Sequence, residues 1–176
     1  MGEKSVRLFF ALWPTDEFRF QIAENLKRFN IDRNQNRLVT NSNLHLTLHF
    51  IGNTSLAEMK CLDRQARLVN AEPFDLCVDC SGYFKKPKVL WFGCQTVPKA
   101  LYDLHRNLGE LIRQCTYTPE KRPYSPHVTV ARKINGEPGS ILIDPVDWQV
   151  DRFVLVESIS VSGGVLYEVV ESYMFV

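Results

Sequence analysis

The sequence lacks the features of a membrane protein, a secreted protein and a nucleic-acid coat. Its longest uncharged apolar stretch, residues 8–15, is far shorter than the about 20 residues needed to span a bilayer. No basic segment, apolar core and small-residue cleavage site open the chain, so we expect a cytoplasmic protein with no membrane partner. Lysine and arginine total 21 against 20 acidic residues, a net charge of +1. That balance excludes a protein that coats long nucleic acids, but it allows a small site for one or two phosphates.

A complete zinc-binding pattern is also missing. Cys77 and Cys80 have the spacing of zinc knuckles and redox motifs, but no second Cys or His pair at similar spacing accompanies them. His45 and His49 could supply that pair only by giving up the role argued below. The segment around the two cysteines alternates like a strand, which favours inert thiols and leaves a zinc protein as a weaker alternative. We therefore expect no metal and no cofactor.

The number of cysteines is odd, which argues against a disulfide framework. Without a secretion signal, such a set is typical of reduced thiols. We therefore expect all five to be reduced. They are Cys61, Cys77, Cys80, Cys94 and Cys115.

The chain does contain what one folded domain over residues 1–176 requires. With 45% hydrophobic and 23% charged residues, it can bury a core that needs no metal or disulfide. Helices are predicted to begin at Thr15, at Ser55 and near Pro98, and Ser55 forms a capping-box pattern with Glu58. Strands are predicted over residues 6–13, 44–51, 74–83, 89–95, 128–131, 153–161 and 166–176.

The order of these elements repeats along the chain. The strand over 6–13, the helix from Thr15 and the strand that carries His45 are echoed by the strand over 89–95, the helix near Pro98 and the strand that carries His127. The halves share almost no sequence identity, so the echo rests on element order and spacing. It predicts approximate repeat halves, residues 1–84 and 85–176, packed about a pseudo-twofold axis with one equivalent strand of each facing a common cleft.

Each of those two strands carries the same four-residue pattern. The first motif is His45-Leu-Thr-Leu and the second is His127-Val-Thr-Val. Because strand side chains alternate between faces, the histidine and threonine of each motif project together, and the apolar residues project into the core. By the same alternation His49 is predicted to face the side of His45 and to be a peripheral member of the site. His105, on the third helix, is predicted to be structural.

Two imidazoles and two hydroxyls in one cleft suit the cleavage of a phosphodiester. An imidazole has an ordinary pKa of about 6.5 and can hold or release a proton near neutral pH. Cleavage needs one group to take a proton from the attacking oxygen and another to give one to the leaving oxygen. Threonine hydroxyls can donate hydrogen bonds to the non-bridging oxygens. The pattern therefore predicts a metal-independent paired catalytic site.

These residues resemble the two-histidine phosphoesterases with their HXTX motifs, and within them the bacterial and archaeal RNA 2′,3′-cyclic phosphodiesterases once called 2′-5′ RNA ligases. The resemblance covers essentially the whole chain. It is carried by Arg7-Leu-Phe-Phe-Ala-Leu, by His45-Leu-Thr-Leu-His-Phe-Ile-Gly52 and by Ser125-Pro-His-Val-Thr-Val-Ala-Arg132. It implies an α+β fold with two pseudo-symmetric lobes, each an antiparallel-rich sheet flanked by helices, and an active site in the groove between them.

The resemblance also implies a reaction and residue roles. A 2′,3′-cyclic phosphate at an RNA end would be opened to a 2′-phosphate, with His45 as the proton donor and His127 as the proton acceptor. Thr47 and Thr129 would hold the phosphate oxygens. Substrate-binding roles would fall to Arg132 at the phosphate and to Phe50 stacked on the terminal base. His49 departs from the family pattern and is counted with the substrate-binding residues only because it is predicted to face the side of His45.

Three other functions stay open at this point. The same histidines could join RNA halves, such as transfer RNA halves, through a 2′-5′ linkage. A non-catalytic module could bind RNA ends without turnover, although intact His and Thr in both motifs disfavour it. A zinc protein built on Cys77 and Cys80 is the weakest alternative. The expected partners are RNA ends or nucleotides that bear a 2′,3′-cyclic phosphate, bound by a monomer.

Overall fold

The fold joins three helices to an antiparallel sheet. The computed structural model describes residues 5–29, 31–32, 36–138 and 142–176. Its helices are α1 (Asp16–Leu26), α2 (Leu56–Ala66) and α3 (Lys99–Ile112), with short 3₁₀ turns η1 (Asn41–Asn43) and η2 (Arg113–Cys115). The strands are β1 (Val6–Leu12), β2 (Arg37–Leu38), β3 (Leu46–Thr54), β4 (Phe74–Val78), β5 (Cys80–Phe84), β6 (Val89–Gly93), β7 (Val128–Arg132), β8 (Val146–Val150), β9 (Arg152–Val161) and β10 (Gly164–Met174). Thr15 and Ser55 cap their helices, and Ser55 completes its capping box with Glu58, as predicted.

The main sheet has eight strands and is narrowest at its middle. Its order is β10-β9-β1-β3-β7-β6-β5, with β2 beside β7, and β4 pairs with β8 in a separate sheet. The motif strands β3 and β7 are neighbours, joined by the single pair of Leu46 with Val128. This junction divides the sheet into a first lobe (β10, β9, β1 and β3) and a second lobe (β7, β6, β5 and β2). The predicted α+β class, with antiparallel sheets flanked by helices, is confirmed.

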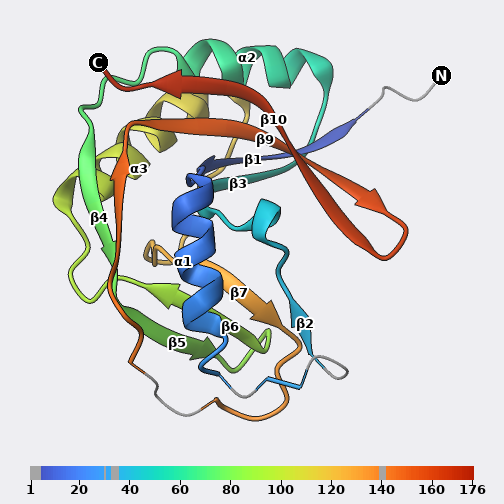
Figure 1. Ribbon diagram of the computed structural model, residues 1–176. Helices are drawn as coiled ribbons and strands as arrows, with labels where there is room; N and C mark the ends of the chain where they lie inside the picture. The colour runs from blue at the N-terminus through green and yellow to red at the C-terminus, as the bar shows by residue number, and fades with distance from the viewer. Residues whose placement is uncertain (1–4, 30, 33–35, 139–141) are drawn as a thin grey trace.

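The helices cross between the lobes. Helix α1 follows β1 of the first lobe, but Phe29 beyond its end packs on Phe92 of β6 in the second. Helix α3 follows β6, but packs on α2 and on β3 of the first lobe. Figure 1 shows α1 in front of the sheet and α2 next to β10, and α3 packs on α2. Each lobe is therefore packed against a helix that follows a strand of the other lobe. These crossed connections hold the two lobes together.

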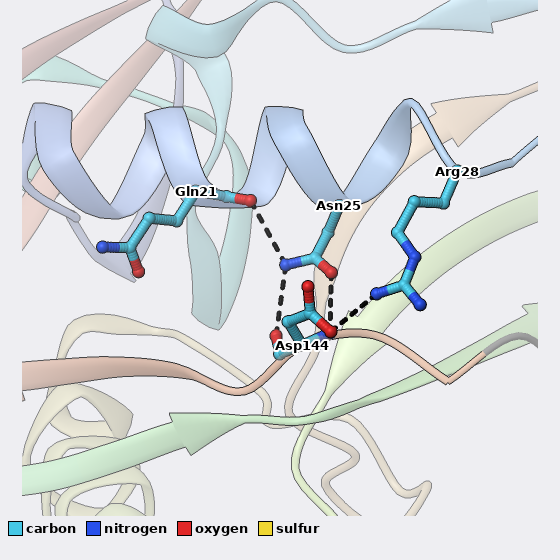
Figure 2. Close-up of polar contacts among 4 residues, drawn as sticks. All are labelled: Gln21, Asn25, Arg28 and Asp144. Carbon is cyan, nitrogen blue, oxygen red and sulfur yellow. Dashed lines mark hydrogen bonds and ion pairs between the residues drawn. The ribbon is translucent and has the colours of Figure 1, made fainter.

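A buried asparagine fixes the end of α1. The Asn25 side chain donates hydrogen bonds to the carbonyl oxygens of Gln21 (3.3 Å) and Asp144 (3.1 Å) and accepts one from the Asp144 amide (2.7 Å). Figure 2 shows these contacts and the ion pair of Arg28 with the Asp144 carboxylate at 2.7 Å. Because every polar atom of this buried side chain is used, the segment that enters β8 is held against α1.

The predicted halves do not coincide with the lobes. Strand β5, from the segment 1–84, lies in the second lobe beside β6. Strands β9 and β10, from the segment 85–176, form the edge of the first lobe beside β1. The order of elements does repeat, since β1, α1 and β3 are matched by β6, α3 and β7. The repeat therefore covers only these strand–helix–strand units, because other strands of each half pair in the opposite lobe. The assignment of the chain to a single domain stays a prediction.

The largest differences from the predicted strands are a break in one strand, an extension of another and two unpredicted strands, β2 and β8. The strand predicted over 74–83 is interrupted at Asp79, because β4 pairs with β8 whereas β5 pairs with β6. The Asp79 carboxylate accepts a hydrogen bond from the Gln95 amide at 2.8 Å, which stabilises the break. Strand β3 continues past its predicted end to Thr54. Strand β8 was not predicted, although its residues alternate between buried and exposed positions.

The expectation of five reduced thiols is wrong for two cysteines. Cys61 on α2 and Cys115 at the end of η2 form a disulfide, with their Cα atoms 5.7 Å apart. The packing of α2 against α3 brings together two residues that are 54 positions apart, which no local pattern could indicate. Cys77, Cys80 and Cys94 are free thiols.

The described residues show neither a metal cluster nor a membrane helix. Within residues 5–29, 31–32, 36–138 and 142–176, no three His, Cys, Asp or Glu side chains gather as metal ligands. Cys77 and Cys80 lie on β4 and β5, which belong to different sheets. No helix in this part of the chain is long and apolar enough to cross a membrane.

Candidate active site

The junction of β3 and β7 places the two motifs side by side in opposite directions. Leu46 and Val128 are paired across it, and both side chains are buried in the core. Their neighbours therefore project from the opposite face of the sheet. Because the strands are antiparallel, the residue before Leu46 faces the residue after Val128. His45 is thus next to the threonine of the second motif, and His127 is next to the threonine of the first.

Both histidine rings are held by the same local hydrogen bond. The Nδ1 atom of His45 lies 2.7 Å from the carbonyl oxygen of Asn43, and that of His127 lies 2.7 Å from the carbonyl oxygen of Ser125. A carbonyl oxygen only accepts, so Nδ1 carries the hydrogen in both rings. The Nε2 atoms are left to exchange protons with a ligand. Neither carbonyl partner was predicted from the sequence.

His45 is enclosed by aromatic rings from the first lobe. The centres of the Phe9 and Tyr167 rings lie 4.9 Å and 5.1 Å from the centre of the imidazole, and Trp13 stacks on it at 6.0 Å. Phe9 is on β1, Trp13 follows that strand, and Tyr167 is on β10. None of the three was predicted as a site residue, because only the pairing of β1 with β9 and of β9 with β10 brings them here.

His127 has a smaller aromatic surround from the second lobe. Phe84 meets its ring edge-on at 5.0 Å, and Trp91 lies at 6.1 Å. The Trp91 indole occupies the space over Gly82 of the neighbouring strand, where a Cβ atom would lie 2.1 Å from the indole. Glycine at that position therefore allows the indole to pack over β5 beside the histidine, with the two rings tilted by 57°.

Burial keeps both imidazoles neutral in the free protein. Burial is the main cause that lowers the pKa of His45, to about 4. The hydrogen bond to the Asn43 carbonyl raises this pKa, and the positive charges of Arg132 and His127 lower it further. Burial also lowers the pKa of His127, against the Ser125 carbonyl and together with Arg132. Near pH 7 each Nε2 can therefore accept a proton. A bound anion would offset Arg132 and favour protonation of either ring.

A cleft of about 370 Å³ opens beside the junction, lined by one residue of each motif, His45 and Thr129, and not by His127 or Thr47. His45, Thr129 and Arg132 contribute to its wall. The rest of the wall comes from β2, the turn between β9 and β10, and the residues beside them: Arg37, Leu38, Val39, Thr40, Asn43, Val161, Ser162, Gly163, Gly164, Val165 and Tyr167. Asn43, whose carbonyl holds His45, also donates its side-chain amide to the Val165 carbonyl at 2.8 Å. The histidine and the hairpin that borders the cleft are thus fixed by one residue.

His49 does not lie in this cleft, so the predicted side for this residue is wrong. The register of β3 with β1 shifts here, because Phe10 pairs with His49 whereas Ala11 pairs with Thr47. The extra residue is a bulge, which turns His49 to the core face. Only 4% of His49 is exposed, and its Nε2 and Nδ1 atoms lie 2.7 Å from the His105 carbonyl oxygen and 3.1 Å from the Tyr117 hydroxyl. These partners leave no ring nitrogen for a substrate.

Phe50 also lies away from the residues that line the cleft. It is 43% exposed, and the Arg7 guanidinium is 5.0 Å from its ring centre. Phe50 borders a separate hollow with Asn53 and Thr116. The aromatic ring that does line the cleft beside His45 is Tyr167.

A stack of rings behind β3 connects the two motifs. His105 lies between His49 at 4.1 Å and Tyr124 at 3.8 Å, in the structural place predicted for it. The Tyr124 hydroxyl donates a hydrogen bond to the Thr47 carbonyl oxygen at 3.0 Å. Burial raises the pKa of Tyr124, so this hydroxyl stays protonated. A residue just before the second motif thereby holds the backbone of the first.

Comparisons with known proteins agree with this architecture. Residues 14–161 match the model of the 2′-5′ RNA ligase superfamily. The RNA 2′,3′-cyclic phosphodiesterase of Escherichia coli (strain K12) is 32% identical over 126 residues, which are 72% of this chain and 71% of that protein. The RNA 2′,3′-cyclic phosphodiesterase of Thermotoga maritima is 26% identical over 181 residues, 97% of this chain and 96% of that one.

A solved structure extends the similarity to the whole fold. The crystal structure of E. coli LigT complexed with 3′-AMP superposes with a TM-score of 0.86 at 27% identity, over 98% of this chain and 99% of that one. The superfamily match spans both motifs and most of the chain between and around them. This chain therefore belongs to the 2′-5′ RNA ligase superfamily.

Proposed function

We propose that the protein hydrolyses RNA 2′,3′-cyclic phosphate ends to 2′-phosphates, with its two motif histidines as general acid and general base and without a metal ion. One observation carries the proposal. A backbone carbonyl oxygen holds the Nδ1 atom of each imidazole, so that both Nε2 atoms are left for a substrate at the junction of β3 and β7. The curated relatives are named for this hydrolysis, and LigT binds a nucleotide, 3′-AMP.

The reaction would divide its two proton transfers between the lobes. Nε2 of His127 takes a proton from water as the water oxygen attacks phosphorus. The bond from phosphorus to the 3′ oxygen breaks, and Nε2 of His45 gives a proton to that oxygen. The products are a 2′-phosphate and a 3′-hydroxyl. This assignment of donor and acceptor follows the family resemblance.

The charge state of His45 makes its role depend on the substrate. Its pKa of about 4 leaves the free imidazole neutral near pH 7, so it must gain a proton before it can donate one. The negative charge of a cyclic phosphate beside Nε2 offsets the repulsion from Arg132 and His127 and raises the pKa of His45 on binding. Thr47, Thr129 and Arg132 would stabilise the charge on the non-bridging oxygens.

Product analysis tests this function directly. An oligonucleotide with a 2′,3′-cyclic phosphate end is incubated with the protein in excess chelator, and the terminal phosphate is located by chromatography against synthetic standards. We expect a 2′-phosphate with the wild type and almost none with His45→Ala or His127→Ala. A 3′-phosphate, or a rate that chelator abolishes and added metal restores, contradicts the proposal.

The family description makes 2′-5′ ligation a second candidate. Ligation would use the same groups, with a 5′-hydroxyl in place of water as the nucleophile: the 5′ oxygen bonds to phosphorus, the bond from phosphorus to the 3′ oxygen breaks, and that oxygen is protonated. The same assay with an added 5′-hydroxyl oligonucleotide distinguishes the two, because ligation yields a longer product with a 2′-5′ linkage. A bound oligonucleotide that is never converted would indicate a module that only binds RNA ends.

A further inference from the structure

A second arginine lies opposite Arg132 across the cleft wall. Arg37 on β2 pairs directly with Arg132 on β7, and both line the cleft. Like charges opposite each other on neighbouring strands destabilise a sheet. Neither guanidinium has a carboxylate partner among the described residues. Two unpaired cations side by side in a cleft are an arrangement that an anion would stabilise.

The position of Arg37 is fixed from the far side of the cleft. Its Nη2 atom donates a hydrogen bond of 2.5 Å to the carbonyl oxygen of Gly163, in the turn between β9 and β10. The next residue, Gly164, leaves room for the guanidinium, because a Cβ atom there would lie 2.5 Å from Nη2. A guanidinium has five N–H donors, so one bond to Gly163 leaves the others for a ligand. Arg37 is therefore held across the cleft mouth between the two lobes.

We propose that Arg37 forms a second phosphate subsite, which binds the 5′-phosphate group of the terminal nucleotide while the neighbouring Arg132 contacts the cyclic phosphate. This inference rests on the proposed function, in which the cyclic phosphate lies at His45 and Thr129. A nucleoside 2′,3′-cyclic phosphate has only that one phosphate, whereas the end of an RNA chain has another at the 5′ position of the same nucleotide. The planar fork of Arg37 can hold two oxygens of such a group. The subsite makes the protein selective for RNA ends over free cyclic nucleosides.

Two substrates that differ only in this phosphate test the subsite. They are adenosine 2′,3′-cyclic phosphate and adenosine 5′-phosphate 2′,3′-cyclic phosphate, and the readout is the ratio of their kcat/KM values. We expect the wild type to prefer the second by about tenfold or more, as for hydrogen bonds to a charged group. Arg37→Gln should lower that ratio by about tenfold, and Arg37→Lys should restore part of it because lysine keeps the charge without the fork.

Gly164→Ala provides a test that leaves the arginine in place. The new methyl group displaces the guanidinium, which is the end of a flexible side chain, so the ratio should fall as it does in Arg37→Gln. The control is Leu166→Ala in the same hairpin, whose side chain is exposed and absent from the cleft wall. Its ratio should match that of the wild type. Equal losses in Gly164→Ala and Leu166→Ala would overturn the role of Arg37.

The outcomes separate this inference from the function on which it rests. A general loss of folding or catalysis lowers both rates together and leaves the ratio unchanged. If the wild type hydrolyses neither substrate, the proposed function fails. If it hydrolyses both with equal kcat/KM, or if Arg37→Gln keeps the preference, the subsite alone is wrong.

Discussion

His45 and His127 occupy equivalent positions in their motifs, but the lobes surround them differently. Both donate from Nδ1 to the carbonyl oxygen two residues earlier. His45 lies among three aromatic rings of the first lobe and has a pKa of about 4, whereas His127 contacts two rings of the second. The local sequence therefore sets the tautomer of each ring, and the packing of its lobe sets how readily that ring takes a proton.

The largest expected effect comes from removing either histidine. General acid and base catalysis are worth roughly 10²–10⁴-fold each, so His45→Ala and His127→Ala should each lower kcat by about that factor. Because the two act on one transition state, the double variant should be little slower than the slower single variant. Single-turnover rates with a cyclic-phosphate oligonucleotide provide the measurement. Losses that multiply in the double variant would show that the two motifs do not work as a unit.

The pH profile tests whether burial lowers the pKa of both imidazoles. The active pair has one neutral and one protonated imidazole, so kcat/KM should be bell-shaped between two apparent pKa values of the pair. Burial lowers the pKa of both rings below the ordinary histidine value, which moves the maximum below about pH 6.5. Above it kcat/KM should fall about tenfold per pH unit, or about a hundredfold over two units.

A nucleoside 2′,3′-cyclic phosphate suits this measurement, because its phosphodiester does not titrate in the range. A maximum at about pH 7.5 or above would contradict the prediction that burial lowers the pKa of His45 and His127 in the substrate-free protein.

The two threonines provide a sharper comparison of the motifs. Thr47→Val and Thr129→Val remove one hydroxyl each at nearly constant shape. A hydrogen bond to a charged group is worth about 1.5–3 kcal/mol, so each variant should lose roughly ten- to a hundredfold in kcat/KM. Serine at either position keeps the hydroxyl and serves as the matched control. If only one of the two valine variants is impaired, the motifs are equivalent in structure but not in chemistry.

The smallest expected effect concerns the contact that joins the motifs. Tyr124→Phe removes the hydroxyl that donates to the Thr47 carbonyl, while the stack on His105 remains. Loss of about 1 kcal/mol should lower kcat about fivefold and change KM little, because the phosphate contacts are kept. Tyr102→Phe is the control: Tyr102 packs edge-on against Tyr124, but its hydroxyl has no hydrogen-bond partner among the described residues. A rise in KM with kcat intact would contradict this positioning role.

The disulfide and His49 show where prediction from the sequence failed. Pairing of Cys61 with Cys115 requires α2 and α3 to be neighbours, a long-range contact that composition does not encode. His49 was misplaced because one bulge in β3 reverses the alternation on which its predicted side depended. The role of Phe50 at the base, which the family resemblance implies, stays a prediction: its ring is exposed on β3, outside the residues that line the cleft.

The sequence by itself determined the chemistry of the motifs. A period of two places a histidine and a threonine on one side of each strand and leucine or valine on the other, and that requires no knowledge of the neighbouring strands. Only the tertiary structure decided that Leu46 pairs with Val128, that aromatic rings enclose His45, and that Arg37 lies opposite Arg132. Alternation is a local property of the backbone, whereas register, bulges and helix placement depend on contacts between residues far apart in the chain.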